Sequence, residues 1–196
     1  MRPDKRQAIL RGALSVFARD GYSRASIDGI AKEAEVSTRT LYNHFADKAE
    51  LFRAVIQASA DEVAQDQIQL IERHFHKITD LQQDLVEFGR AMGAQQGHAE
   101  HFALVRQINA ELTHIPAEAV EAWLDRGPRK VRKALADELG ELGFKDPARA
   151  AIHLLLLTLT GDPAVRGSRP SDDDIAAGVQ VFLHGHDVEN PATAAT

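Results

Sequence analysis

The sequence predicts an all-α protein with an N-terminal three-helix bundle that contains a helix-turn-helix, followed by a larger helical domain. Apolar residues recur at helical spacing along the chain, and prolines and glycines stand where helices would begin and end. No segment has the alternation of a half-buried strand or an Asn-Gly hairpin turn. With 44% hydrophobic residues over 196 positions, the chain can form a core in one or two domains.

The first two helices are predicted by their apolar spacing and their caps. A helix is expected over residues 4–20, and Gly21 stands where a left-handed C-terminal cap is needed. Ser26 is a preferred N-cap residue, and Asp28 is favourable near the positive end of the helix that Ser26 opens. This second helix is expected to end near Glu35.

A short third helix and a long fourth helix follow directly. Ser37 can cap the third helix, in which Leu41 and Phe45 lie four residues apart on one face. Asp47 and Glu50 form an Asp-x-x-Glu start, a variant of the capping box. The long helix that they open has apolar residues at helical spacing, namely Leu51, Val55, Ile56, Val63, Ile68 and Ile71.

The remaining residues keep the helical pattern. Pro116, Pro128 and Pro147 each stand in the first turn of a candidate helix, where proline is tolerated. Residues 161–171 contain Gly and Pro and form the clearest non-helical connection, and residues 187–196 are expected to be a flexible tail. The candidate helices cover residues 79–95, 98–113, 116–126, 128–142, 147–160 and 172–185.

Composition excludes several classes of site. The chain has no cysteine, so a disulfide framework, a thiolate metal site and a cysteine nucleophile are all excluded. Its start carries charges without a following apolar run, unlike a signal peptide. The longest apolar stretch, Ala150 to Leu159, is too short to span a bilayer. We therefore expect a soluble, cytoplasmic protein that has no contact with a membrane.

The net charge of −6 is unevenly distributed. Residues 1–55 hold 10 Lys and Arg against 7 Asp and Glu, a balance of +3, and the remaining residues have a balance of −9. Attraction to phosphate depends on the surface that faces the duplex, because charges are screened beyond about 10 Å at 0.1 M salt. The acidic remainder therefore does not exclude DNA binding, although the local excess alone supports it only weakly.

Residues 26–48 form a pattern that suits DNA recognition. A helix-turn-helix needs a small core that holds its second helix at the angle required to enter a major groove about 12 Å wide. Thr38, Arg39 and Thr40 lie at the start of that helix, where base edges are normally reached, and Arg39 is the best candidate for reading guanine. Tyr42 and His44 are better placed for sugar and phosphate.

Lys48 completes the predicted contact surface. It lies in the first turn of the long helix, where an ammonium group and nearby backbone N–H groups can together bind phosphate. The predicted DNA-binding set is Ser26, Ser37, Thr38, Arg39, Thr40, Tyr42, Asn43, His44 and Lys48.

This region also resembles a known family. VSTRTLYNHFADKAELF, Val36 to Phe52, is similar to the recognition helix and following turn of the TetR family of repressors. The resemblance extends upstream through DGYSRASIDGIAKEAE, Asp20 to Glu35. The chain departs from the family at Glu35, where the turn usually has glycine, because glutamate tolerates a left-handed conformation less well. Farther along, RQINAELTHIPAEAVEAWLDRG, Arg106 to Gly127, and the DPARAA run from Asp146 are similar to the AefR-like branch.

The resemblance implies a homodimer that places two recognition helices about 34 Å apart on a near-palindromic operator. Residues 1–47 would bind DNA, and residues 48–186 would form the ligand-binding and dimerisation domain. By analogy with the family, the last two helices would pack against the partner as a four-helix bundle. The expected interface residues are Leu154, Leu155, Leu157, Ile175, Val179 and Phe182.

A small-molecule effector that releases the repressor from DNA is the implied partner of the middle helices. Apolar side chains with a few polar anchors would form its pocket. The same residues equally fit an ordinary core, and Arg106 could pair with Glu111 or Glu121 instead. The candidate pocket residues are Phe88, Met92, Phe102, Arg106, Asn109, Trp123 and His153.

Two other kinds of function remain as alternatives. The nine histidines allow a small helical metal-binding protein or enzyme, but the best-spaced pair, His98 and His101, has no evident third ligand except Glu100 or His114. The sequence presents no assembled nucleophile, base and orienting group, so we expect neither a metal nor a cofactor nor catalysis. An activator or an architectural DNA-binding protein without ligand control is the second alternative.

Overall fold

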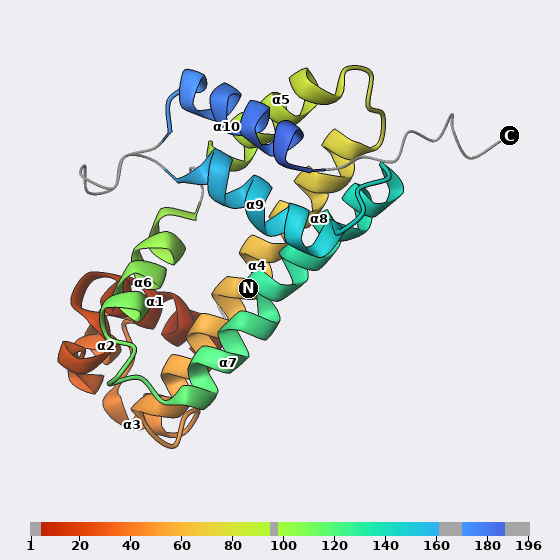
Figure 1. The fold of residues 1–196 in the computed structure, drawn as a ribbon. Helices are drawn as coiled ribbons and strands as arrows, with labels where there is room; N and C mark the ends of the chain where they lie inside the picture. The colour runs from red at the N-terminus through yellow and green to blue at the C-terminus, as the bar shows by residue number, and fades with distance from the viewer. Residues whose placement is uncertain (1–4, 95–97, 161–169, 187–196) are drawn as a thin grey trace, which may run out of the picture. The chain divides into compact units, whose positions relative to one another are not determined.

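The computed structural model describes residues 5–94, 98–160 and 170–186, and these are predominantly α-helical (Figure 1). Each predicted helix is present, with ends that differ by a few residues, which confirms the all-α class. The predicted tail 187–196 and most of the predicted connection 161–171 lie outside the described residues. The helices are α1 (Lys5–Arg24), α2 (Ile27–Glu33), α3 (Thr38–Tyr42), α4 (Lys48–Phe75), α5 (Leu81–Gly93), α6 (Ala99–Ala110), α7 (Ala117–Arg126), α8 (Pro128–Glu141), α9 (Pro147–Leu159) and α10 (Asp172–Gly185).

The first helix is longer than predicted. Gly21 adopts a positive φ of 81°, as its predicted role requires, but its ψ of 173° is extended. Helical hydrogen bonding resumes after this kink and continues to Arg24. The helix is thus interrupted at Gly21, as predicted, and the residues after Gly21 add one further helical turn that was not predicted.

The chain divides into two compact units whose boundary differs from the predicted domain boundary. Unit 1 comprises residues 1–64 and 96–128, and unit 2 comprises residues 65–95 and 129–196. Unit 1 extends past residue 47 because α6 packs directly on α1 (Figure 1). The assignment of DNA binding to residues 1–47 remains a prediction about function, whereas the compact unit needs later helices as well.

The core of unit 1 joins the short N-terminal helices to α4 and α6. Phe17 of α1 and Phe52 of α4 are fully buried and meet edge to face, with ring centroids 4.9 Å apart. Leu41 anchors α3 with no exposed surface, and Leu104 and Ile108 of α6 complete the same cluster. Burial of each such side chain stabilises the fold by about 1.5–3 kcal/mol.

Unit 2 is built around the mutual packing of α5, α9 and α10. Phe88 of α5 is fully buried and lies edge to face against Phe75, at 5.3 Å between ring centroids. The backbones of α9 and α10 approach closely at Gly178, where a Cβ atom would overlap the main-chain carbonyl of Leu157. Glycine is therefore required for this helix contact.

Candidate nucleic-acid interface

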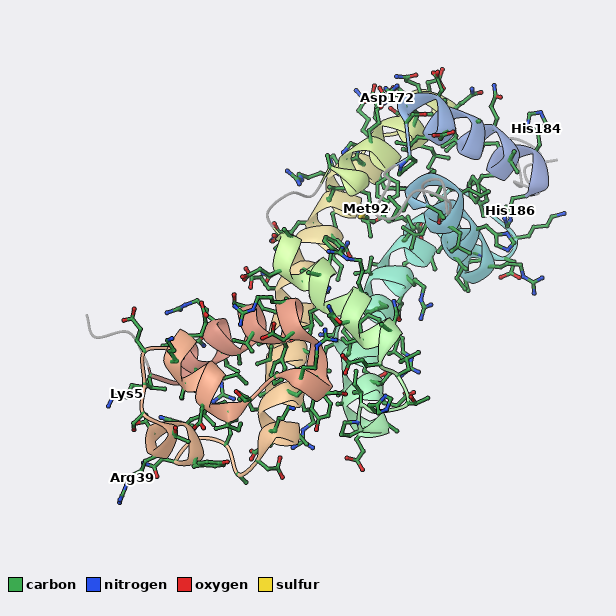
Figure 2. All side chains as sticks on the ribbon, turned by 90° about the vertical axis from the view of Figure 1, so that its left-hand side faces the viewer. Lys5, Arg39, Met92, Asp172, His184 and His186 are labelled. Carbon is green, nitrogen blue, oxygen red and sulfur yellow. The ribbon has the colours of Figure 1, made fainter. Side chains whose placement is uncertain are left out.

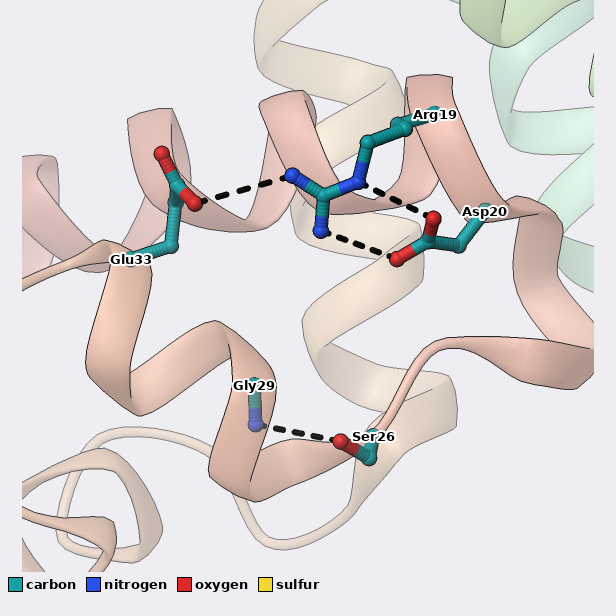
Figure 3. Close-up of polar contacts among 5 residues, drawn as sticks. All are labelled: Arg19, Asp20, Ser26, Gly29 and Glu33. Atoms are coloured by element: carbon teal, nitrogen blue, oxygen red, sulfur yellow. Dashed lines mark hydrogen bonds and ion pairs between the residues drawn. The ribbon is translucent and has the colours of Figure 1, made fainter.

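The two caps predicted for the helix-turn-helix are formed as expected. Ser26 has an extended backbone, and its Oγ accepts a hydrogen bond from the amide of Gly29 at 3.1 Å (Figure 3). Arg19 of α1 binds Asp20 through two hydrogen bonds of 3.0 Å and reaches Glu33 at 3.8 Å, so α1 also contacts the end of α2 (Figure 3). The hydrogen bond with Arg19 lowers the pKa of the Asp20 carboxyl, despite some opposing desolvation.

The turn between α2 and α3 accommodates its unusual residue. Glu35 adopts a left-handed conformation, with φ of 54°, at the position where the family usually has glycine. The turn is nevertheless closed by hydrogen bonds from the Glu35 amide to Lys32 O, at 3.2 Å, and from the Val36 amide to Ala31 O, at 2.9 Å. Left-handed backbone disfavours a residue with a Cβ by roughly 1–2 kcal/mol, so the turn forms at the expense of local strain.

The recognition helix α3 is held from its N-terminal end and from beneath. Ser37 Oγ accepts the Thr40 amide at 3.0 Å and also bonds the Thr40 hydroxyl at 2.8 Å. Thr38 donates to Asp28 Oδ1 at 3.1 Å, which links α3 to α2. Beneath the helix, Phe45 is 2% exposed. These contacts hold α3 in place although it has only five residues.

All nine predicted DNA-binding residues lie within unit 1, and most of them face solvent. Arg39 extends away from the ribbon (Figure 2). Tyr42 is 52% exposed, which is unusual for a large aromatic side chain and suits contact with a partner. Thr38, Thr40 and Lys48 are half-buried, and the exposed members are Ser26, Ser37, Arg39, Tyr42, Asn43 and His44.

The start of α4 differs in detail from the predicted capping box. Asp47 Oδ1 accepts the Glu50 amide at 2.8 Å as expected, but the Glu50 carboxylate accepts the amide of Ala46, at 2.7 Å. The Lys48 ammonium donates to the carbonyl of Ser23 at 3.3 Å and lies 4.8 Å from the ring centroid of Tyr22. Partial burial lowers the pKa of Lys48, and the charge of Glu111 opposes this shift.

Two contacts around this surface were missed by sequence reasoning. Arg6 of α1 lies over the ring of Phe45, with its Cζ 5.4 Å from the centroid. Glu111, just after α6, hydrogen-bonds Ser23 at the end of α1. The positive charge of Arg6 was visible in the sequence, but no local pattern indicates a partner 88 residues away, as for Glu111 and Ser23.

The residues predicted for an effector pocket are distributed over both units. Phe88 and Met92 belong to the core of unit 2, whereas Phe102 and Trp123 are partly buried in unit 1. Arg106, Asn109 and His153 are exposed, and their role as polar anchors of a pocket stays a prediction. The exposed His153 instead forms a 3.0 Å hydrogen bond with the ring of His186.

Unit 1 does contain a buried polar pair that the sequence did not single out. Ser59 Oγ of α4 and His101 Nδ1 of α6 are 2.8 Å apart, and both side chains are more than nine-tenths buried. Burial lowers the pKa of His101 to about 4, and the charge of His98 adds to this shift. In addition, the indole Nε1 of Trp123 is buried and has no hydrogen-bond partner.

The residues predicted for a dimer interface differ in their exposure. Four of them, Leu154, Ile175, Val179 and Phe182, are at most 4% exposed within the single chain and belong to the core of unit 2. Leu155 and Leu157 are half-buried, and contact of these six residues with a partner stays a prediction. The large apolar side chains that do face solvent on these helices are Ile152, Leu156 and Val181, with 41%, 59% and 60% exposure.

The described residues contain neither a metal-binding cluster nor a membrane-spanning helix. Within residues 5–94, 98–160 and 170–186, no group of three or more His, Asp or Glu side chains could hold a metal ion. Over the same ranges, no helix is long and apolar enough to cross a membrane.

The chain is similar to known bacterial regulators. Residues 9–55 match the family model of bacterial regulatory proteins of the tetR family. The HTH-type transcriptional activator FasR of Mycolicibacterium smegmatis is 42% identical over 189 residues, covering 94% of this chain and 83% of FasR.

Solved structures agree in fold. A crystallised protein from Mesorhizobium loti assigned to the TetR family has a TM-score of 0.80 at 26% identity, over 94% of this chain and 97% of that one. The flavonoid-responsive regulator FrrA has a TM-score of 0.64 at 28% identity, over 93% and 97% of the two chains. Together with the cap, turn and contact geometry of α2 and α3, these similarities show that the chain belongs to the TetR family of DNA-binding transcriptional regulators, and is not an enzyme.

Proposed function

We propose that this protein is a ligand-responsive repressor that binds a near-palindromic operator as a homodimer in the cytoplasm. The observation that carries the proposal is the construction of α3. Its outward side chains are polar or cationic, with Arg39 exposed to solvent, while Leu41 and Phe45 anchor it from beneath. A rigid helix with an exposed guanidinium near its start suits the reading of guanine in a major groove.

The surface proposed for dimerisation is the solvent-exposed apolar face of α9 and α10, represented by Ile152, Leu156 and Val181. Apolar side chains exposed on two neighbouring helices are favourably buried by a second copy of the same surface. To bind successive major grooves, the two recognition helices of such a dimer would have to lie about 34 Å apart, one turn of DNA.

Effector control requires a ligand that binds better to one arrangement of the sensor helices than to another. In this proposal the ligand shifts α4, whose first residues carry Lys48, and thereby weakens operator binding. Coupling is reciprocal, so operator DNA must weaken ligand binding by the same factor, commonly about 1–3 kcal/mol. The name of FrrA, a flavonoid-responsive regulator, supports a ligand-responsive mode.

Activation of transcription is the second candidate. It is favoured by FasR, which is named an activator and is 42% identical over nearly the whole chain. Both candidates use the same DNA-contacting surface, and they differ only in the effect that the bound dimer has on a promoter. A reporter gene behind the bound DNA distinguishes them, because deletion of the regulator raises expression for a repressor and lowers it for an activator.

The deciding experiment is a gel shift on the DNA that flanks the protein's own gene. The test variant combines Arg39→Ala with Lys48→Ala, and the control combines Arg73→Ala with Lys77→Ala, which removes two positive charges from exposed positions of unit 2. We expect the wild type and the control to bind and the test variant to lose most of its affinity. Equal binding by the test variant would refute the assigned contact surface.

Salt provides an independent measurement. Each phosphate contact releases counterions, so affinity should fall by a factor of about 10³ or more between 50 and 200 mM salt for a dimer with several contacts. A nearly flat response would contradict this mode of binding.

A further inference from the structure

The end of α6 is joined to the corner between α1 and α2 by one carboxylate. Glu111 Oε2 accepts two hydrogen bonds from Ser23, one from its amide at 2.8 Å and one from its hydroxyl at 2.7 Å. Both residues belong to unit 1. A carboxylate that accepts two donors from one residue fixes the backbone of that residue as well as its side chain.

The backbone of α1 is shaped to admit this carboxylate. Gly21 interrupts the helix with φ of 81°, and a Cβ atom at this position would overlap Oε1 of Glu111. The glycine therefore serves two purposes, since it permits the positive φ and leaves space for the carboxylate.

Glu111 is held as an anion. Partial burial alone would raise its pKa, but the hydrogen bonds from Ser23 and the charge of Arg24 outweigh burial, so the pKa lies below its ordinary value. The two hydrogen bonds are thus charge-assisted at neutral pH, which makes them stronger than bonds between neutral groups.

The same serine contacts the DNA-facing start of α4. The Ser23 carbonyl accepts the Lys48 ammonium at 3.3 Å, and this ammonium lies over the Tyr22 ring. Tyr22 in turn packs on Phe52, with ring centroids 4.8 Å apart. Because an ammonium has three donors, one can bind Ser23 while another remains for a phosphate oxygen.

We propose that Glu111 is a positioning residue for DNA binding, which acts through Ser23 to hold the Lys48 ammonium where it meets the operator backbone. The inference rests on the proposed function and extends it, because it makes α6 a part of the DNA-binding apparatus. The Ser59–His101 hydrogen bond connects the other end of α6 to α4. A displacement of α6 therefore reaches Lys48 through the Glu111–Ser23 contact.

The test is a double-mutant cycle on operator affinity with Glu111→Gln and Lys48→Ala. Glu118→Gln is the matched control, because it removes one negative charge from an exposed position of α7 in the same unit. Loss of a negative charge by itself strengthens attraction to DNA, so the control should bind equally or slightly better. Glu111→Gln should instead weaken binding by about tenfold, the equivalent of one hydrogen bond to a charged group.

The cycle tests whether Glu111 acts through Lys48. In the Lys48→Ala background, Glu111→Gln should change affinity by less than about twofold, because the group that it positions is gone. The proposal would be overturned if Glu111→Gln lowered operator affinity by the same factor with and without Lys48, or if Glu111→Gln bound the operator more tightly than the wild type. Ser23→Ala, which removes only the hydroxyl donor, should weaken binding in the same direction and should do so only when Lys48 is present.

Thermal unfolding of each variant separates positioning from loss of the fold. Affinities are compared at a temperature where every variant is folded, and if Glu111→Gln does not fold, Ser23→Ala takes its place in the cycle. The wild type tests the proposed function by itself. If the wild type binds none of the DNA that flanks its gene, operator binding at that place is refuted. Binding by the wild type with independent effects of the two substitutions refutes only the role of Glu111.

Discussion

The exposed faces of α3 and α9 differ in chemistry and in how they relate to the core beneath them. On α3, polar and cationic side chains face solvent while Leu41 is fully buried. On α9, apolar side chains lie on both sides, since Leu154 is fully buried and Leu156 is 59% exposed. A clear division into polar and apolar faces identifies the buried side of a helix from sequence, whereas a helix that is apolar nearly all round does not.

The largest effect on stability is expected on the buried side of α9, and the exposed side should contribute little. Leu154→Ala should lower the free energy of unfolding by about 2–5 kcal/mol, because it leaves a cavity in the core of unit 2. Leu156→Ala should change the stability of the protomer by less than about 0.5 kcal/mol but should weaken self-association. Urea unfolding and sedimentation over a range of protein concentrations measure the two quantities. If Leu156→Ala left self-association intact, the proposed interface would be wrong.

The buried histidine of unit 1, His101, should make the protein less stable in acid. His101 is neutral in the folded protein down to about pH 4, whereas its unfolded pKa is near 6.5, so the unfolded state binds more protons between these values. Stability should therefore fall as the pH drops from about 6.5 to about 4, by at most about 3 kcal/mol from this group. The measurement is unfolding free energy against pH.

Two variants assign that pH dependence. His101→Gln keeps an amide that can bond Ser59 but cannot titrate in this range, so it should flatten the profile. His114→Gln removes an exposed histidine from the same unit and should leave the slope unchanged. A slope that survives in His101→Gln would show that other groups cause the acid sensitivity.

Arg39→Ala should lower affinity for DNA without lowering the stability of the fold, in contrast to Leu154→Ala. Because the side chain is exposed, the unfolding free energy should change by less than about 0.5 kcal/mol. Operator affinity should fall by about 1–3 kcal/mol if the guanidinium reads a guanine. Fluorescence anisotropy with operator and with unrelated DNA checks the result, and Lys77→Ala is the charge-matched control. An equal loss on both DNAs would assign Arg39 to phosphate rather than to a base.

The smallest effect concerns the turn that supports α3. Glu35→Gly should stabilise the protein by about 1 kcal/mol, because glycine adopts the left-handed conformation without a steric penalty. Glu35→Asn should stabilise it less, and Glu35→Ala, which removes the charge but keeps the Cβ, should have little effect. Thermal unfolding gives the ranking. Equal stabilisation by all three would indicate charge repulsion in place of backbone strain.

Much of the candidate interface could be predicted because its signals are local. Ser26 and Ser37 cap helices that begin at the next residue, and Leu41 and Phe45 follow from spacing alone. The exposed side of α9 and the Glu111–Ser23 contact could not be predicted in this way. The first depends on which side of an apolar helix the neighbouring helix covers, and the second joins residues 88 positions apart.

The discontinuity of unit 1 has a consequence for how the protein is made and for how it can be recombined. Its core includes Leu104 and Ala119 as well as the N-terminal helices, with residues 65–95 belonging to the other unit. During synthesis, therefore, the core of unit 1 is completed only after α6 and α7 have left the ribosome. A chimera that exchanges only residues 1–47 between relatives would pair foreign surfaces inside one core, whereas an exchange that carries α6 and α7 along keeps that core native.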